Sequence, residues 1–204
     1  QPQQGRTVMA ASGATSTASG AGRAYVVFGG PGMFALSGVT TTGFDLSTLN
    51  GSNGGFIVNG YTQVPNARTG FSVGKAGDFN GDGFDDVIVG IPGAASGNYG
   101  TAIVIFGHAS PFANISTAAL NSITPLTSPA GYPMFGGFFN SAVGISVRGA
   151  GDMNGDGFDD AIVGGPGDHK AYLAMGGANA TLNARTTDFG GGLVGLDLSN
   201  GVYG

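Results

Sequence analysis

The sequence predicts an all-β fold of short strands joined by tight turns. Glycine accounts for 42 of the 204 residues, and the glycines lie between short runs of Val, Ile and Phe without the Gly-X-Y period of collagen. This spacing is typical of strands separated by tight turns. Only 9% of the residues are charged, so the chain is not a disordered polyelectrolyte, and its length is sufficient to bury a core.

One strand pattern returns along the chain. It combines a small residue, an apolar run and a glycine, and it occurs as "GRAYVVFGG" (22–30), "GTAIVIFGH" (100–108) and "HKAYLAMGG" (169–177). A second element recurs as "FDLSTLNG" (44–51), "FANISTAALN" (112–121) and, more weakly, "LDLSNG" (196–201). Each period of about 70 residues holds four short apolar segments, which is the content of one four-stranded antiparallel blade of the β-propeller type.

The repeats divide the chain into four expected segments. These are a low-complexity N-terminal segment (1–22), a first repeat (23–107), a second repeat (108–177) and a partial third repeat (178–204). Within the first segment we expect residues 6–12, "RTVMAAS", to form a docked strand. Two full periods are fewer than the four to eight blades of a closed ring, so we expect an array that does not close within one chain.

An acidic segment is written twice. Residues 77–90, "GDFNGDGFDDVIVG", and 151–164, "GDMNGDGFDDAIVG", are identical at twelve of fourteen positions. The chain has twelve Asp and no Glu, and eight of the Asp lie in these two segments. The remainder of the chain is net basic, with seven Lys and Arg against four Asp. Such concentrated negative charge is costly unless a cation binds there.

The spacing of oxygen-bearing side chains in each acidic segment predicts a calcium site. They fall at positions 1, 3, 5 and 9, with a glycine at position 6 whose positive φ would turn the chain around an ion. Calcium takes about six to eight oxygen ligands, whereas magnesium prefers a strict octahedron and retains its waters. The predicted ligands are the side chains of Asp78, Asn80, Asp82 and Asp86 with the Phe84 carbonyl, and those of Asp152, Asn154, Asp156 and Asp160 with the Phe158 carbonyl.

The residues after each loop exclude an EF-hand. Position 12 is Val89 in one copy and Val163 in the other, where an EF-hand needs Glu, and the flanking apolar runs indicate strands instead of helices. We therefore expect each calcium loop to join the two strands of a β-hairpin, with Asp86 and Asp160 at the start of the second strand.

The pattern D-x-N-x-D-G-x-x-D followed by "VIVGIPG" or "AIVGGPG" resembles the FG-GAP repeat. This repeat is found in the β-propeller of integrin α subunits and in bacterial surface proteins. The FG elements are Phe28-Gly29 and Phe106-Gly107, and the GAP elements begin at Gly90 and Gly164. The resemblance covers about residues 22–177 and implies calcium in the loop between the first two strands of a blade. It also implies an extracellular or cell-surface location.

No catalytic constellation stands out, so we expect a protein that is not an enzyme. His108 and His169 are the only histidines, and no Gly-x-Ser-x-Gly motif accompanies them. Three functions stay open. The first is an extracellular calcium-binding protein with a structural or adhesive role. The second is a self-assembling subunit of an extracellular filament or sheath, joined by N-terminal strand donation. The third is a non-catalytic domain of a larger surface protein or hydrolase.

The expected partners are other copies of the chain or neighbouring repeats, together with a surface protein or glycan ligand. Basic residues are few and dispersed, which argues against nucleic acid. No apolar run reaches the roughly 18 residues needed to span a bilayer, so we expect no membrane insertion. The sequons at Asn50, Asn114 and Asn179 are candidate glycosylation sites.

Overall fold

A computed structural model describes residues 6–11, 19–29, 39–40, 43–51, 54–60, 64–94, 99–109, 114–116, 131–136, 139–178, 186–188 and 194–197. In these ranges the regular structure consists of β-strands and two single-turn 3-10 helices, η2 (Leu46–Thr48) and η3 (Pro166–Asp168). The all-β prediction is confirmed. No helix in the described part of the chain is long and apolar enough to cross a membrane.

The strands form three main sheets and one small hairpin. The first sheet has the order β1 (Arg6–Ala11), β2 (Arg23–Phe28), β5 (Gly55–Asn59) and β9 (Ile115–Ser116). The second has the order β14 (Thr186–Asp188), β15 (Val194–Asp197), β10 (Tyr132–Phe135), β8 (Thr101–Ile105), β7 (Asp86–Ile91) and β6 (Ser72–Gly77). The third contains β11 (Ser146–Gly151), β12 (Asp160–Gly165) and β13 (Lys170–Ala174), and β3 (Val39–Thr40) pairs with β4 (Gly43–Phe44).

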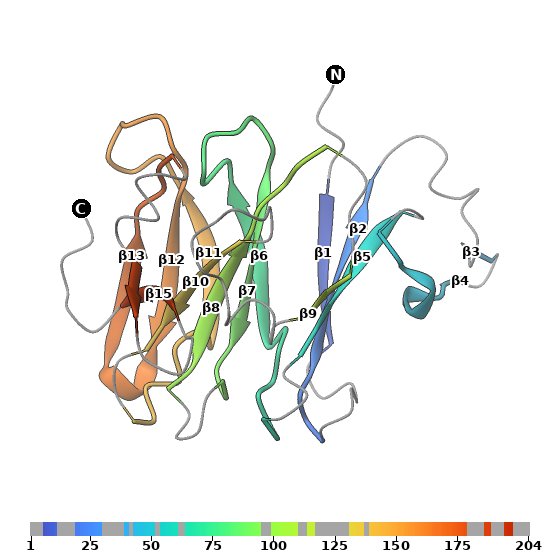
Figure 1. The fold of residues 1–204 in the computed structure, drawn as a ribbon, viewed down its shortest axis with the longest axis horizontal. Coiled ribbons are helices and arrows are strands. Elements are labelled where there is room, and N and C mark those ends of the chain that lie inside the picture. Colours follow the sequence, from blue (N-terminus) through green and yellow to red (C-terminus); the bar gives the residue numbers. More distant parts are fainter. Residues whose placement is uncertain are drawn as a thin grey trace.

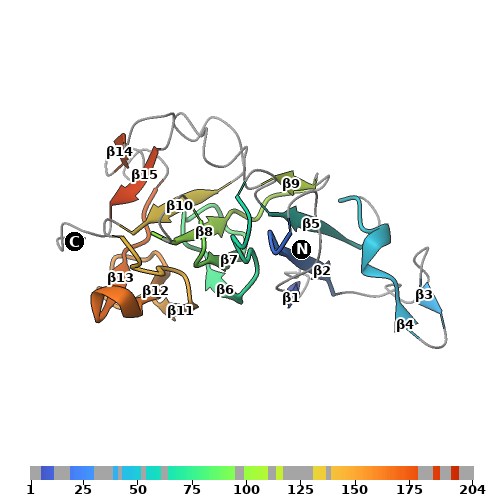
Figure 2. The same ribbon diagram turned by 90° about the horizontal axis from the view of Figure 1, so that it is seen from below.

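The three main sheets stand side by side like successive blades of a propeller (Figure 1). Strands β6, β7, β8 and β10 make the predicted four-stranded antiparallel blade. Figure 2, seen from below, shows β6 and β11 next to each other at the inner edges of their sheets. The described strands form no closed ring, in line with the expectation of an open array.

The sheets are out of phase with the sequence repeats. The predicted first repeat, 23–107, supplies β2 and β5 to the first sheet and β6, β7 and β8 to the second. A blade therefore begins at β6, just before the acidic loop, and ends at β10, within the predicted second repeat (108–177). The segments before and after these repeats likewise join sheets made by the repeats, through β1 on one side and β14 and β15 on the other.

Strand β1 occupies the place in its sheet that β7 and β12 occupy in theirs. The central pairs have the same register in all three sheets: Val8 opposite Val26, Ile88 opposite Val104, and Ile162 opposite Leu173. The predicted docked strand in the N-terminal segment is therefore present, and it pairs with β2 of its own chain. Residues 7–11, "TVMAA", lie in register with 87–91, "VIVGI", an alignment that the sequence analysis missed.

Two short strands connect neighbouring sheets. β9 follows β8 of the second sheet but pairs in parallel with β5 of the first, and β15 follows β13 of the third sheet but pairs in parallel with β10 of the second. The registers correspond, with Val58 opposite Ile115 and Met134 opposite Leu196. Each sheet is thus tied to the next by backbone hydrogen bonds as well as by side-chain packing.

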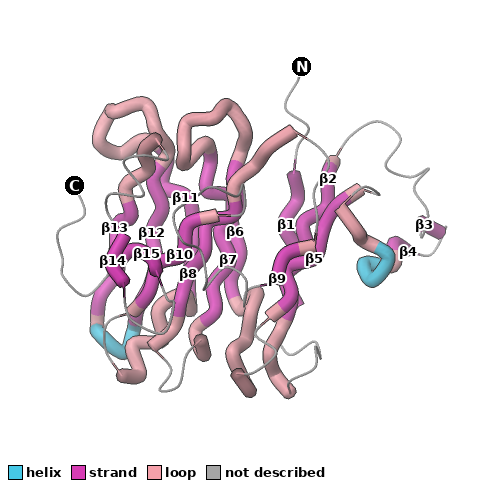
Figure 3. Tube along the Cα trace, in the orientation of Figure 1, coloured by secondary structure: helices cyan, strands magenta, loops and turns pink. Residues whose placement is uncertain are grey.

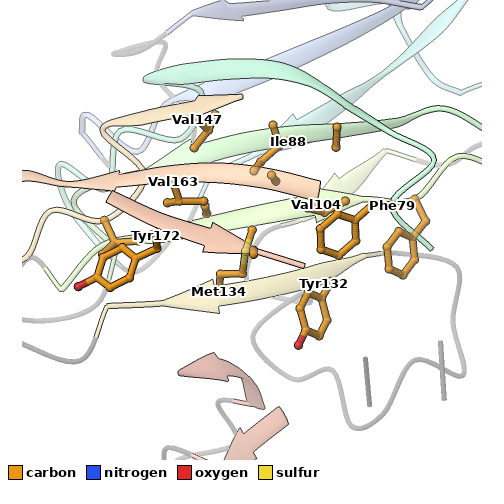
Figure 4. Close-up of a cluster of buried hydrophobic side chains, with 14 residues drawn as sticks. Phe79, Ile88, Val104, Tyr132, Met134, Val147, Val163 and Tyr172 are labelled. Atoms are coloured by element: carbon orange, nitrogen blue, oxygen red, sulfur yellow. The ribbon is translucent and has the colours of Figure 1, made fainter. Parts of the chain in front are cut away.

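Apolar side chains fill the space between successive sheets. Figure 4 shows the cluster between the second and third sheets, where Phe79, Ile88, Val104, Tyr132 and Met134 meet Val147, Val163 and Tyr172. A second cluster lies between the first and second sheets and includes Val26, Val58, Val89 and Ile103. Alternate residues of each strand therefore face opposite neighbours, as the period-two side-chain direction of a strand requires.

Ile88 and Ile162 test this arrangement because they hold the same position in β7 and β12. Ile88 is fully buried by the third sheet, whereas Ile162 is 42% exposed on the far face of that sheet. Ile88→Val should lower the free energy of unfolding by about 0.5–1.5 kcal/mol, because it removes a buried methyl group. Ile162→Val should change it by less than about 0.5 kcal/mol in urea denaturation. Equal losses in the two variants would contradict the stacking of the sheets.

Candidate metal centres

The two acidic loops lie side by side at one end of the molecule, as the adjacent loops in Figures 1 and 3 show. Residues 78–85 connect β6 to β7, and residues 152–159 connect β11 to β12. Strand β7 begins at Asp86 and β12 begins at Asp160, so the predicted hairpin placement is confirmed. The pairing shifts register immediately before each loop, at Lys75/Gly77 and at Gly149/Gly151. Such a bulge re-aims the strand as it enters the turn.

The carboxylate at position 1 organises each loop. In the first loop, Asp78 Oδ1 accepts from the Asp82 N–H at 3.0 Å and Oδ2 accepts from the Gly83 N–H at 2.9 Å. In the second, Asp152 Oδ1 accepts from the Asp156 N–H at 3.1 Å and Oδ2 accepts from the Gly157 N–H at 2.9 Å. One carboxylate thus holds the backbone at positions 5 and 6 and folds the loop back on itself.

The side chains at positions 3 and 5 are held in the same way in both loops. Asn80 Nδ2 donates to Asp82 Oδ2 at 2.9 Å, and Asn154 Nδ2 donates to Asp156 Oδ2 at 2.9 Å. The asparagine Oδ1 in turn accepts the N–H of position 5, at 3.1 Å in the first loop and 3.0 Å in the second. The predicted ligands at positions 1, 3 and 5 therefore converge within each loop, and the repeat in sequence is a repeat in geometry.

Glycines allow the loop to turn where the sequence analysis expected them to. Gly83 and Gly157, at position 6, have φ of +86° and +91°, which is the region that favours glycine. Position 4 has the same property, with φ of +73° at Gly81 and +77° at Gly155. The sequence analysis identified only position 6.

The aspartate at position 9 is buried below the loop. Asp86 accepts from the Phe79 N–H at 2.9 Å and from the Gly107 N–H at 2.7 Å. Asp160 accepts from the Met153 and Gly176 N–H groups, both at 2.9 Å. Gly107 and Gly176 follow the apolar strands of the recurring pattern, so the position-9 carboxylate ties the hairpin loop to the third strand of its blade.

The electrostatics of the first loop favour a cation. Burial is the main reason that the pKa of Asp86 is raised to about 8; the negative charges of Asp82 and Asp78 act in the same direction, and the hydrogen bonds from Gly107 and Phe79 act against it. The three carboxylates are thus close enough to repel one another. Among the described residues, no three or more His, Cys, Asp or Glu side chains are gathered at metal-binding distances.

The donor set nevertheless fits a hard divalent cation. All the predicted side-chain ligands offer oxygen, from carboxylates and from the asparagine amides, and calcium prefers such donors. An ionised carboxylate offers about four lone-pair sites. Even the Asp152 carboxylate, which accepts the N–H groups of Gly155, Asp156 and Gly157, therefore retains one for an ion. At position 7, the N–H groups of Phe84 and Phe158 donate to the position-5 carboxylates at 2.9 and 3.0 Å.

The loops also contact each other through a residue that the sequence analysis did not single out. Asp159, at position 8 of the second loop, accepts from the Asp78 N–H at 2.8 Å through Oδ2. Its own N–H donates to the Asp78 carbonyl at 3.2 Å. Only the pairing of two loops 74 residues apart in sequence reveals this role.

The other candidate residues lie in separate places. Nδ1 of the His108 ring is 2.7 Å from the Ala109 carbonyl oxygen, and His169 ends η3 in the left-handed region with φ of +56°. Asn50 is exposed. The Asn114 amide accepts from the Ile57 N–H at 2.8 Å and donates to the Leu49 carbonyl at 3.2 Å, so a glycan on its nitrogen would disturb the second bond. Asn179 lies outside the described residues.

Comparison with known families bears directly on the first loop. Residues 69–106, which contain β6, the first acidic loop, β7 and β8, match the model of the FG-GAP repeat. These residues carry an FG-GAP repeat. The third sheet repeats the same strand–loop–strand arrangement in the same register, so the FG-GAP pattern of residues 69–106 has a structural counterpart in β11, β12 and β13.

The chain is also similar to integrin α subunits. It is 37% identical to "Integrin alpha-PS5" of Drosophila melanogaster over 108 residues, which cover 52% of this chain and 10% of the relative. It is 34% identical to "Integrin alpha-PS3" of the same organism over 107 residues, 52% of this chain and 9% of the relative. It is 32% identical to "Integrin alpha-E" of Mus musculus over 112 residues, which cover 52% of this chain and 9% of the relative. The chain spans about a tenth of the length of these relatives.

Proposed function

We propose that the chain is a non-catalytic β-repeat protein of the cell surface or extracellular space, with a structural or adhesive role and two bound calcium ions. The observation that carries the proposal is the pair of acidic loops with matching hydrogen bonds at positions 1, 3, 5 and 9. The match to the FG-GAP repeat and the similarity to integrin α subunits support the adhesive role and the location.

In this proposal each ion neutralises carboxylates that otherwise repel. Asp78, Asn80, Asp82 and Asp86 with the Phe84 carbonyl would hold the first ion, and the corresponding residues of the second loop would hold the other. The chemistry that calcium supplies here is charge neutralisation and cross-linking of the turn. Because each loop joins the first two strands of a blade, a bound ion would stabilise the hairpin against opening.

Calcium dependence of stability tests the proposal. The melting temperature of the wild type should rise when calcium is added and fall back when a chelator removes it. At a free calcium concentration of 100 times the Kd, one site adds about 2.7 kcal/mol to the free energy of unfolding. Asp82→Ala and Asp156→Ala should each remove part of this shift, and the double variant should remove all of it. Asp45→Asn is a matched control, because it removes a negative charge from an exposed position outside the loops and keeps an oxygen to accept the Ser47 N–H.

Isothermal titration of the wild type should give two calcium ions per chain, and the single variants one each. A wild type that binds no calcium, or a double variant that retains the full stabilisation, would contradict the proposal.

One observation favours neighbouring repeats as partners. In the part of the chain that the structure describes, Ile162 is exposed on the far face of the third sheet, whereas Ile88, at the same position of the second sheet, is buried against the third sheet. A further blade of the same type would cover Ile162 in the way that β11, β12 and β13 cover Ile88. We propose that such a blade, from a longer chain or from another copy, is the partner of this face.

A further inference from the structure

The two acidic loops form one connected unit through position 8 of the second loop. The Asp159 carboxylate accepts from the backbone N–H of Asp78, and the Asp159 N–H donates back to the Asp78 carbonyl, at 2.8 and 3.2 Å. Asp78 is position 1 of the first loop, where both carboxylate oxygens hold the backbone turn. Asp159 directly precedes Asp160, which is position 9 of the second loop. Two reciprocal hydrogen bonds thus join Asp78, at position 1 of the first loop, to Asp159, at position 8 of the second.

The first loop is shaped to receive this contact. A Cβ on Gly77 would collide with the Asp159 carboxylate, and a Cβ on Gly81 would collide with the Phe158 ring. At the corresponding glycines of the second loop, Gly151 and Gly155, no atom of the described residues lies within 4 Å of such a Cβ. The absence of a side chain at Gly77 and Gly81 therefore serves the contact between loops, beyond the positive φ that all four glycines share.

A third hydrogen bond joins the first loop to the segment that follows β13. The Gly177 N–H donates to the Phe79 carbonyl at 2.9 Å, and Phe79 is position 2 of the first loop. The neighbouring Gly176 N–H donates to Asp160 at 2.9 Å, so the same two-residue segment touches both loops. The Asp78 N–H, the Asp78 carbonyl and the Phe79 carbonyl are thus bonded to the second loop and the segment beside it, while the Phe79 N–H donates to Asp86 of its own loop.

We propose that Asp159 is a positioning residue that couples the two calcium sites, so that an ion in one loop raises the affinity of the other. This inference rests on the proposed calcium binding. An ion in the first loop orders Asp78 and therefore fixes the peptide groups to which Asp159 is hydrogen-bonded. Part of the conformational entropy that the second loop loses on binding its own ion has then already been lost. An ion in the first loop also attracts the Asp159 carboxylate and draws residues 159–160 toward their bound position. By reciprocity the second ion favours the first equally.

The first test compares calcium affinities and needs no change at position 159. The affinity of the first loop is measured alone in Asp156→Ala, and that of the second loop alone in Asp82→Ala. The overall two-ion affinity of the wild type is then compared with the product of these two. We expect the two-ion affinity of the wild type to exceed this product by about tenfold, which is within the usual range of coupling between sites. Equality would overturn the coupling while leaving calcium binding intact, and no binding at all would instead overturn the proposed function.

The second test assigns the coupling to Asp159. Calcium titration of the wild type should give a Hill coefficient of about 1.5, which corresponds to tenfold coupling between two sites. Asp159→Ala should lower it to about 1 with two ions still bound, whereas Asp159→Asn, which keeps an oxygen to accept the Asp78 N–H, should retain most of the coupling. Asp85→Ala is the control, because it removes the same charge at position 8 of the first loop and leaves the Asp78–Asp159 contact in place.

The outcomes separate a coupling role from a structural one. Loss of cooperativity in Asp85→Ala as well as Asp159→Ala would assign the effect to charge alone and overturn the role of the contact. A fall in melting temperature of Asp159→Ala with an unchanged Hill coefficient would make Asp159 a structural residue only.

Discussion

Replacing Phe79 with alanine is expected to lower the free energy of unfolding by about 3–5 kcal/mol. Phe79 is position 2 of the first acidic loop, yet its side chain is fully buried. Its ring lies 6.0 Å from the Tyr132 ring, centroid to centroid, within the cluster between the second and third sheets (Figure 4). Alanine would leave a cavity at the point where the loop, the outer strand β10 and the next blade meet, and packed neighbours close such a cavity only in part.

Met153→Ala is the matched control for this prediction. Met153 is position 2 of the second loop, but it is 58% exposed because no described blade covers that side of the third sheet. Its replacement should change the free energy of unfolding by less than about 0.5 kcal/mol. Urea denaturation of both variants in chelator measures the difference without any contribution from metal. Comparable losses at the two positions would contradict the burial of the first loop against its neighbour.

Replacing Gly100 with alanine is expected to cost about 3 kcal/mol or more. Gly100 has φ of +77° and forms an isolated parallel bridge with Val143, which joins the second sheet to the start of the third. A Cβ there would collide with the backbone N and O of Val143, and backbone atoms yield less easily than the end of a flexible side chain. The variant is therefore destabilised in two ways: alanine is strained at this positive φ, and its Cβ forces the second and third sheets apart at the Gly100–Val143 bridge.

Gly155→Ala separates these two effects. Gly155 has the same φ of +77°, but within the described part of the chain a Cβ there would meet no atom within 4 Å. We expect it to cost only the conformational part, about 1 kcal/mol, when both variants are unfolded thermally in chelator. If Gly100→Ala were no more damaging than Gly155→Ala, the close approach of the two backbones would be wrong.

The hairpin loops could be predicted from the sequence because the residues that determine their conformation are close together in the chain. Nine consecutive residues contain the carboxylates, the amide and the glycines, and the hydrogen bonds within each loop join residues two to seven positions apart. The apolar run after each loop indicates a strand, and β7 and β12 begin at the predicted aspartates. The chain repeats these features, and the second loop confirms that the same local pattern gives the same local geometry.

Contacts between repeats were not predictable in the same way. Asp85 and Asp159 are identical in sequence position, yet the described contact with Asp78 belongs to Asp159, because the second loop lies beside the first. Ile88 and Ile162 share one position in their strands but differ in burial for the same reason. The pairing of β1 was also missed, since Ala and Ser in "TVMAASGA" weaken the apolar signal that its counterpart "VIVGIPGA" displays.

The all-β class, the blade repeat and the two acidic hairpin loops could be predicted from the amino-acid sequence, because turn chemistry and the alternation of apolar residues act over a few neighbouring positions. The pairing of β1 with β2, the pairing of β9 and β15 with the preceding sheet, and the contact of Asp159 with the first loop follow from the three-dimensional arrangement of the repeats. These features depend on which repeat lies beside which. Identical residues in successive repeats acquire different neighbours when the sheets stack, and so they acquire different roles.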